Sequence, residues 1–119
     1  MKKLITLLAL VGCVSAQAQS RFVADGTNDT MFREGVATYS DNNGLTALSW
    51  FKYQGKFDSG TDRTLIQVHC DSRLFRIIRN ISFRNGRVIS DTGENWSASW
   101  MNPVPGTLTT EVQQICYTR

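Results

Sequence analysis

Residues 108–116, which read LTTEVQQIC, are the stretch of sequence that decides the fold. Their apolar residues recur at i, i+4, i+7 and i+8, the spacing of one face of a helix. Thr107 precedes them as an N-cap, where a threonine oxygen accepts a hydrogen bond from a free backbone amide. Glu111 lies near the positive end of the helix dipole. We therefore expect one C-terminal α-helix whose apolar face, which includes Cys116, packs against the rest of the protein.

Upstream of this helix the pattern is that of strands separated by polar turns. Residues 102–106 read NPVPG and end any β-ladder, because proline has no amide hydrogen to donate. Residues 35–40 are a candidate strand, and an Asn-Gly turn at 41–44 joins them to a partner strand at 45–53, since Asn and Gly tolerate positive φ. Residues 54–62 are the least hydrophobic segment, and we expect a mobile loop there.

The middle of the chain predicts three more strands. Residues 64–70 alternate between apolar and polar, which favours a strand with Cys70 facing the core. Residues 73–84 fit both helical spacing and strand alternation. Their β-branched and aromatic content, and the hairpin signal Arg-Asn-Gly-Arg at 84–87, favour a strand that pairs with residues 88–91.

The first eighteen residues have the three-part layout of a secretory signal, with two lysines, an apolar run at 4–11 and then small residues. The apolar run is far shorter than the roughly twenty residues of a membrane-spanning helix, and no comparable run follows. We expect export through the Sec pathway to the periplasm, the outer membrane surface or the extracellular space. The mature chain should have no transmembrane helix.

Two sites of signal cleavage compete. The Ala-Gln-Ala sequence at 16–18 fits the small-x-small rule and would release a chain that starts at Gln19. Residues 10–13, which read LVGC, resemble a bacterial lipoprotein box in which Cys13 would be acylated. We favour simple release, because the apolar run is short for a lipoprotein signal.

Residues 19–119 form a single expected domain. A chain of this length buries one hydrophobic core, and no repeat or linker divides it. It keeps 11 of the 13 Lys and Arg residues against all 10 Asp and Glu, so it is nearly neutral. Nucleic acid is therefore a poor expected partner.

Two cysteines remain after cleavage at residue 18, and they can pair in only one way, Cys70 with Cys116. An oxidising compartment favours this disulfide, which would fasten the C-terminal helix to the sheet. The alternative is two unpaired buried thiols. A metal site is not expected, because His69 is the single histidine and its neighbours Cys70 and Asp71 alternate across the strand.

The order of these features resembles a known family. The chain presents a strand ending at Cys70, an Arg-rich strand that begins CDSRLFR, a turn at Gly86, Trp96, the sequence PGT at 105–107 and a helix ending at Cys116. This order resembles the bacterial surface-adhesin protein E family over residues 36–116, and the sequence LSW at 48–50 is similar to the family's tryptophan-bearing strand. The resemblance implies an α+β fold, with an antiparallel sheet of about five or six strands and one C-terminal α-helix disulfide-linked to it. It also implies adhesion to a host extracellular-matrix protein.

Arginine side chains are the first candidates for ligand binding. Five of them fall within residues 73–87: Arg73, Arg76, Arg79, Arg84 and Arg87. In a regular strand Arg76 and Arg84 share one face, and Arg73 and Arg79 share the other. We take Arg73, Arg76, Arg84 and Arg87 as a candidate basic surface for an acidic ligand, a glycan sulfate or a lipid headgroup. The alternative is a solvated sheet edge, with Arg79 paired to an acidic residue.

Aromatic residues are the second candidates, because aromatic side chains contribute strongly to binding hot spots. Phe57, in the expected loop, and Trp100, beside the proline segment, are the two we single out. The alternative is that both belong to the core, which a sheet with one helix must fill with large side chains.

The sequence argues against an enzyme. Its one histidine adjoins a cysteine expected in a disulfide, and its acidic residues fall mostly in turns. No phosphate-binding loop or metal-ligand spacing occurs, so no cofactor is expected. Two binding functions remain. An adhesin-like protein of the cell envelope predicts surface exposure and either lipidation or a homodimer, whereas a small periplasmic protein that binds or inhibits a partner protein predicts a soluble monomer.

Overall fold

The computed structural model describes residues 20–41, 44–57 and 59–117 of the chain. Within them six strands and one helix follow one another: β1 (Ser20–Asp25), β2 (Asp29–Ser40), β3 (Thr46–Gly55), β4 (Gly60–His69), β5 (Leu74–Arg84), β6 (Arg87–Asp91) and η1 (Leu108–Cys116). Each strand pairs antiparallel with the next, so the sheet order is the chain order. This arrangement confirms the expected antiparallel sheet with a C-terminal helix. The predicted signal segment at 1–18, with Cys13, lies outside the described residues.

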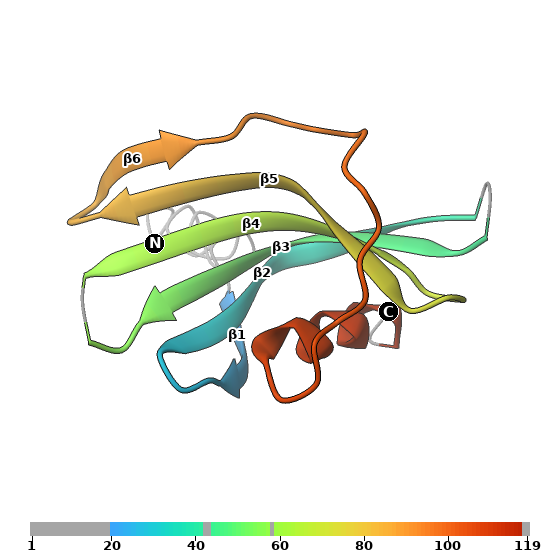
Figure 1. Ribbon diagram of the computed structural model, residues 1–119, viewed down its shortest axis with the longest axis horizontal. Coiled ribbons are helices and arrows are strands. Elements are labelled where there is room, and N and C mark those ends of the chain that lie inside the picture. The colour runs from blue at the N-terminus through green and yellow to red at the C-terminus, as the bar shows by residue number, and fades with distance from the viewer. Residues whose placement is uncertain (1–19, 42–43, 58, 118–119) are drawn as a thin grey trace, which may run out of the picture.

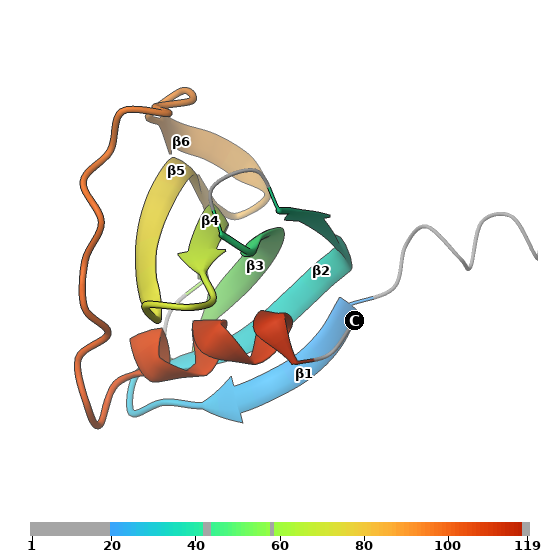
Figure 2. The same ribbon diagram turned by 90° about the vertical axis from the view of Figure 1, so that its right-hand side faces the viewer.

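The sheet is curled, and η1 lies across its concave side (Figures 1 and 2). The helix contacts β1, β3 and β4. The turns that join β3 to β4 and β5 to β6 lie at the end of the sheet that η1 does not reach (Figure 1). The helix therefore covers one part of the concave face and leaves the rest without a covering element.

The hydrophobic core lies between η1 and the sheet. Phe51 of β3 is its largest fully buried side chain, at 1% exposure, and Val112 and Ile115 of η1 are completely buried. The core comprises Met31, Ala37, Ala47, Phe51, Ile66, Val68, Phe75, Val112 and Ile115. Cys70 packs against this core, as the alternation of residues 64–70 predicted.

The C-terminal helix starts where the sequence predicted, but it is wound more tightly. Thr107 is its N-cap, and the threonine hydroxyl accepts a hydrogen bond from the backbone amide of Thr109 at 3.4 Å. The helix is of the 3₁₀ type rather than the expected α type. Side chains three residues apart are aligned in a 3₁₀ helix. The two completely buried residues, Val112 and Ile115, have this spacing, so the tighter winding aims both at the core.

A disulfide fastens this helix to the sheet. It joins Cys70, just after β4, to Cys116, the last residue of η1, with a Cα–Cα distance of 5.8 Å. That distance is usual for a disulfide. The Tyr39 hydroxyl adds a hydrogen bond to the backbone oxygen of Ile115 at 2.7 Å. The pairing that the cysteine count allowed is therefore confirmed, as is its role in joining the helix to the sheet.

The first two strands extend beyond what the sequence predicted. β2 begins at Asp29 rather than at residue 35, and residues 20–25, for which no strand was expected, form β1. The register of β2 against β3 shifts around Gly35, whose φ is +73°. An irregularity of this kind interrupts the alternation of side chains. Only the part of β2 that follows it was therefore recognisable as a strand.

Much of residues 54–62, where a mobile loop was expected, belongs to two strands instead. β3 runs to Gly55 and β4 begins at Gly60, and Tyr53 and Asp62 are register partners in the ladder between them. These strand ends lie in the part of the sheet that the helix leaves uncovered. These residues are polar because they contact solvent, and their polarity does not mean that a strand is absent.

The ambiguous segment at 73–84 forms β5, a strand with a bulge. Its register against β4 jumps from Ile77 to Arg79, which leaves Ile78 as an extra residue. Ile78 is buried, at 1% exposure. Because one extra residue shifts the alternation, even-numbered residues after the bulge lie on the face that odd-numbered residues occupy before it.

The edge of β5 that faces away from β4 is paired in both of its halves. The Asn-Gly hairpin to β6 is confirmed, with φ of +52° at Asn85 and +77° at Gly86. After β6 the chain returns along the first half of β5, where Phe75 and Met101 exchange two backbone hydrogen bonds of 2.9 and 2.7 Å. This returning segment covers the part of the β5 edge that β6 does not reach.

Candidate binding groove

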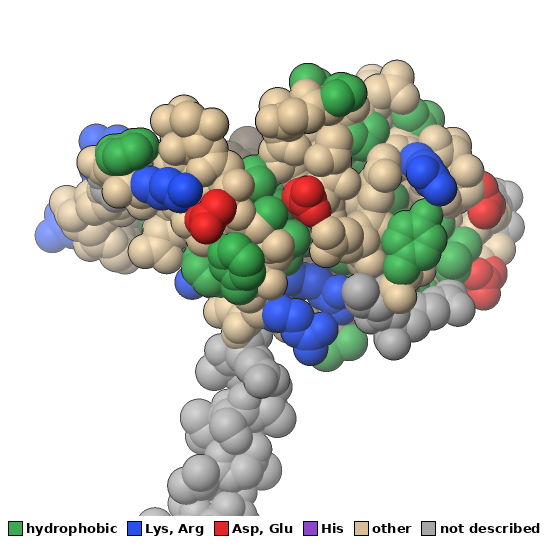
Figure 3. Space-filling model, turned by 90° about the horizontal axis from the view of Figure 1, so that it is seen from below, with side chains coloured by type: hydrophobic (Ala, Val, Ile, Leu, Met, Phe, Trp, Pro, Cys, Tyr) green, Lys and Arg blue, Asp and Glu red, His purple; other side chains and the backbone are tan. Residues whose placement is uncertain are grey.

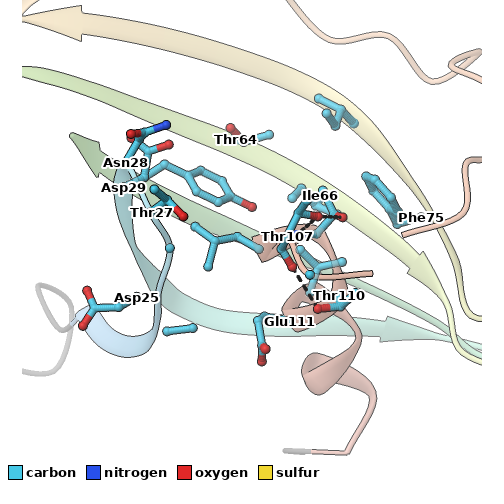
Figure 4. A pocket seen from close by; sticks show the side chains of 18 residues that line it. Asp25, Thr27, Asn28, Asp29, Thr64, Ile66, Phe75, Thr107, Thr110 and Glu111 are labelled. Atoms are coloured by element: carbon cyan, nitrogen blue, oxygen red, sulfur yellow. Dashed lines mark hydrogen bonds between the residues drawn. The ribbon is translucent and has the colours of Figure 1, made fainter. Parts of the chain in front are cut away.

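Beside η1 the concave face of the sheet holds a hollow of about 680 Å³. Its floor is apolar and comes from the sheet, with Ile66 of β4 and Phe75 and Ile77 of β5. One wall is the turn between β1 and β2, residues 24–29, and the other is residues 106–112, which lead into η1 (Figure 4). The volume falls in the range of about 300–1,000 Å³ that is typical of ligand sites.

A second depression, of about 200 Å³, adjoins the first. It lies at the ends of β3, β4 and β5, and Arg84 is part of its lining. Asp29 and Tyr53 line both depressions. Because they share these residues, the two depressions are neighbours, and we call them together the concave groove.

A row of hydrogen-bonded polar side chains follows the concave face between β4 and β5. The Thr64 hydroxyl donates to Asn80 Oδ1 at 2.8 Å, and the Ser82 hydroxyl donates to the Asp62 carboxylate at 2.5 Å. Asn80 and Ser82 lie on this face because of the bulge at Ile78. Sequence reasoning missed these residues, although polar residues at alternate positions in two neighbouring strands were the signal for them.

Tyr53 lies where the two parts of the groove meet. Burial raises the pKa of its hydroxyl to about 12, and the negative charge of Asp29 adds to this rise. The hydroxyl therefore stays protonated at neutral pH and can donate a hydrogen bond to a ligand. Within the described residues, the Asp29 carboxylate has neither a hydrogen-bond partner nor an ion-pair partner, so it can accept a bond from a ligand.

The lining of the larger hollow carries the carboxylates of Asp25, Asp29 and Glu111, and none of its described residues is basic. Asp25 forms an ion pair with Lys56 at 3.4 Å, and Glu111 accepts a hydrogen bond from Gln114 at 2.6 Å. Acidic side chains lie beside exposed hydrophobic ones on the lower face of the molecule (Figure 3). A groove with this lining favours a ligand that combines positive charge with an apolar part.

The predicted grouping of the arginines is wrong, because the bulge in β5 reverses the alternation. Arg76 is the register partner of Gln67, to which its guanidinium donates at 2.8 Å, and Arg79 is the partner of Leu65. Arg76 and Arg79 therefore share the convex face. Arg84, predicted to lie with Arg76, lies instead on the concave face and lines the groove.

Arg76 and Trp100, both candidate ligand-binding residues, contact each other on the convex face. The guanidinium lies 4.6 Å from the centre of the Trp100 ring, and the His69 ring meets the same indole edge-on at 5.9 Å. Arg76 also donates hydrogen bonds to the backbone oxygens of Trp96 and Ala98. These contacts hold the returning segment against the sheet.

The other candidate residues are divided between the two ends of the sheet. Arg87 is the direct register partner of Arg84 across the β5–β6 hairpin. Phe57, in the β3–β4 turn at the same end, is 82% exposed. Arg73 lies in the β4–β5 turn at the opposite end, where its backbone oxygen accepts a hydrogen bond from Gln113 at 2.9 Å. The structure thus brings Arg84 and Arg87 together and separates Arg73 from them.

Arg79 and Asp91 form an ion pair whose effect on titration can be measured. Two hydrogen bonds of 2.9 and 2.6 Å join their side chains. The bond from Arg79, followed by the backbone amide of Gly93, lowers the pKa of Asp91 from 3.8 to about 2. Because the pKa is lowered in the folded state, this ion pair stabilises the fold above pH 3.8, and its contribution is lost as the pH falls through about 2.

The variant Arg79→Gln should therefore raise the pKa of Asp91 toward its ordinary value of 3.8. An NMR titration of the Asp91 carboxyl carbon measures this change. Arg84→Gln, which removes the same charge from the other face of β5, is the control and should leave the Asp91 pKa unchanged. Equal titration of Asp91 in wild type and Arg79→Gln would contradict the assigned cause.

Neither a family model, nor a curated protein, nor a solved structure matches this chain. Among the described residues no helix has the length and apolar character needed to cross a membrane. The same part of the chain contains no group of three or more His, Cys, Asp or Glu side chains that could hold a metal ion. The functional inference therefore rests on the groove and on the sequence.

Proposed function

We propose that the chain is an exported bacterial protein of the cell envelope that binds another protein and catalyses no reaction. The observation that carries this proposal is the concave groove beside a disulfide-fastened helix. The disulfide fixes one wall of the groove, and a fixed wall reduces the ordering cost of binding. The disulfide also suits an oxidising compartment, in agreement with the signal layout of residues 1–18.

The groups that line the groove are suited to binding rather than to reaction. Tyr53, with a pKa of about 12, is a neutral hydrogen-bond donor at physiological pH. Thr64 offers a hydroxyl in the same hollow, and the floor is apolar. His69, the one histidine of the chain, packs against Trp100 on the convex face, away from the groove. A hydroxyl nucleophile in the groove would therefore lack the imidazole that usually activates it.

Two versions of this function differ in location and partner. In the adhesin-like version the protein stands at the cell surface, by acylation of Cys13 or as a homodimer, and binds a host extracellular-matrix protein. The resemblance to the surface-adhesin protein E family favours this version. In the alternative version, cleavage after Ala18 releases a soluble periplasmic monomer that binds or inhibits a protein of that compartment.

Location is tested by the intact mass of the protein from fractionated cells, measured with and without reduction. A chain that starts at Gln19 and gains two hydrogens on reduction supports export with a disulfide and points to the periplasmic version. A lipid adduct on Cys13 supports the surface version. An uncleaved chain in the cytosolic fraction would contradict export altogether.

Binding is tested with the disulfide-bonded protein purified from its own cells, applied to immobilised extracellular-matrix proteins. The adhesin-like version predicts saturable binding to at least one of them. The same protein, reduced and alkylated, is the control, because it keeps the composition and loses the fastened helix. Equal binding by both forms would indicate nonspecific adsorption and would count against the proposal.

A further inference from the structure

We infer that the concave groove holds an extended peptide segment of the partner protein, in which a lysine or arginine adjoins a large apolar residue. The inference rests on the proposed binding function and names the chemistry of its ligand. Three properties of the groove support it: an apolar floor, an unpaired negative charge where the two depressions meet, and the presence of two neighbouring depressions.

The apolar floor can receive one large side chain. Ile66 and Phe75 are buried in it, at 2% and 4% exposure, whereas Ile77 beside them is 39% exposed. Leu108, the first residue of η1, lines the same hollow and is half-buried. An apolar side chain placed against Ile77 and Leu108 would remove apolar surface of both partners from water, which favours binding.

Asp29 supplies the charge that a basic side chain would meet. Its carboxylate lies at the junction of the two depressions, and no cation within the described residues pairs with it. Its field reaches into the groove, because it contributes to the raised pKa of Tyr53. A partly buried carboxylate attracts a cation more strongly than one in bulk water, since the local dielectric constant is lower. Glu111 on the wall adds charge of the same sign, whereas the charge of Asp25 is offset by its ion pair with Lys56.

The form of the groove suits an extended chain better than a compact ligand. The larger hollow and the second depression share Asp29 and Tyr53 in their linings, and the second is lined by the ends of three neighbouring strands. Polar side chains accompany it, with Thr64 in the larger hollow and Asp62 and Ser82 in the smaller. Such groups can bond the amide and carbonyl groups that a peptide backbone presents at every residue.

The test uses the disulfide-bonded protein purified from its own cells and labelled with ¹⁵N. It is titrated with the capped peptide acetyl-Leu-Lys-Leu-amide and, for comparison, with acetyl-Leu-Glu-Leu-amide. We expect the lysine peptide to shift the amide resonances of Asp29, Tyr53, Ile77 and Leu108. Its dissociation constant should be lower than that of the glutamate peptide by about tenfold or more, and it should rise with salt.

Two groove variants and one control sharpen the test. Asp29→Asn keeps the shape of the side chain and removes its charge. It should lower the affinity for the lysine peptide by about tenfold. Ile77→Ser removes part of the apolar floor at an exposed position, and should lower the affinity for both peptides by the same factor. Asp41→Asn removes one negative charge beyond the far end of β2, outside the groove lining, and should leave both affinities unchanged.

Several results would overturn the inference. They are resonance shifts confined to the outer strands β1 and β6, equal affinity for the two peptides, and equal loss of affinity in Asp29→Asn and Asp41→Asn. If Asp29→Asn also left binding to a matrix protein unchanged, the groove assignment would fail while the proposed binding function stood. Loss of export would instead contradict the proposed function, whatever the peptides do.

Discussion

Replacing Cys70 and Cys116 together by alanine should lower the free energy of unfolding by about 4 kcal/mol, from the loop-entropy relation for this span. The two cysteines are 46 residues apart, so breaking the bridge gives the unfolded chain much more conformational freedom. Domains of this size are stable by about 5–15 kcal/mol in total, so the loss is a large share. Urea unfolding followed by tryptophan fluorescence measures it.

Reduction provides the matched control for this variant. Dithiothreitol should bring the stability of the wild type down to that of the double variant, and it should leave the variant unchanged. The far-ultraviolet signal should show partial loss of η1, because the covalent link to the sheet is gone and the packing of Val112 and Ile115 and the hydrogen bond from Tyr39 are left to hold it. If the double variant unfolded at the same urea concentration as the oxidised wild type, the disulfide would not stabilise the fold.

The variant Phe51→Ala should lower the free energy of unfolding by about 3–5 kcal/mol, the usual range for truncating a buried phenylalanine. Phe51 is 1% exposed and is the largest fully buried side chain of the core between η1 and the sheet. Its removal leaves a cavity that neighbours on both layers cannot fill, because strands and disulfide hold them in place. Urea unfolding again gives the change in the free energy of unfolding.

Phe57→Ala is the matched control, since it makes the same chemical change at a side chain that is 82% exposed. Its effect should stay within about 0.5 kcal/mol of zero. Similar losses in the two variants would mean that Phe51 does not belong to a packed core.

Local chemistry made several elements predictable. The hairpin at 84–87 follows from Asn85 and Gly86, both of which take the positive φ that their sequence favours. The start of the helix follows from the capping oxygen of Thr107. Predicting the disulfide needed only the cysteine count together with the predicted signal segment. The hairpin and the helix start depend on a few neighbouring residues, and the disulfide follows from counting cysteines.

The groove could not be predicted because it depends on an irregularity fixed by tertiary packing. Arg79 interrupts the apolar alternation of residues 75, 77, 81 and 83, but nothing local marks Ile78 as the extra residue. The extra residue in the register determines that Asn80 and Ser82 lie on the concave face. The same shift places Arg84 on the opposite face from Arg76, with which regular alternation had grouped it.

The convex face shows a related limit of sequence reasoning. Trp100 and Arg76 are separated by a complete hairpin and a long connection, so only the return of the chain along β5 brings them together. Sequence reasoning had singled out both as binding candidates. Their contact with each other, and the bonds of Arg76 to the returning segment, give them a structural role.

The backbone pairing of Phe75 with Met101 bears on how this protein avoids aggregation. An open strand edge is a template on which a second molecule can add a strand, and the risk is greatest where the edge is long and hydrophobic. The first half of β5 contains the most apolar part of that strand, yet its edge is already occupied by the returning segment. Intermolecular strand addition is thereby confined to β1 and to the short strand β6. The most apolar stretch of strand edge is thus closed by the protein's own chain.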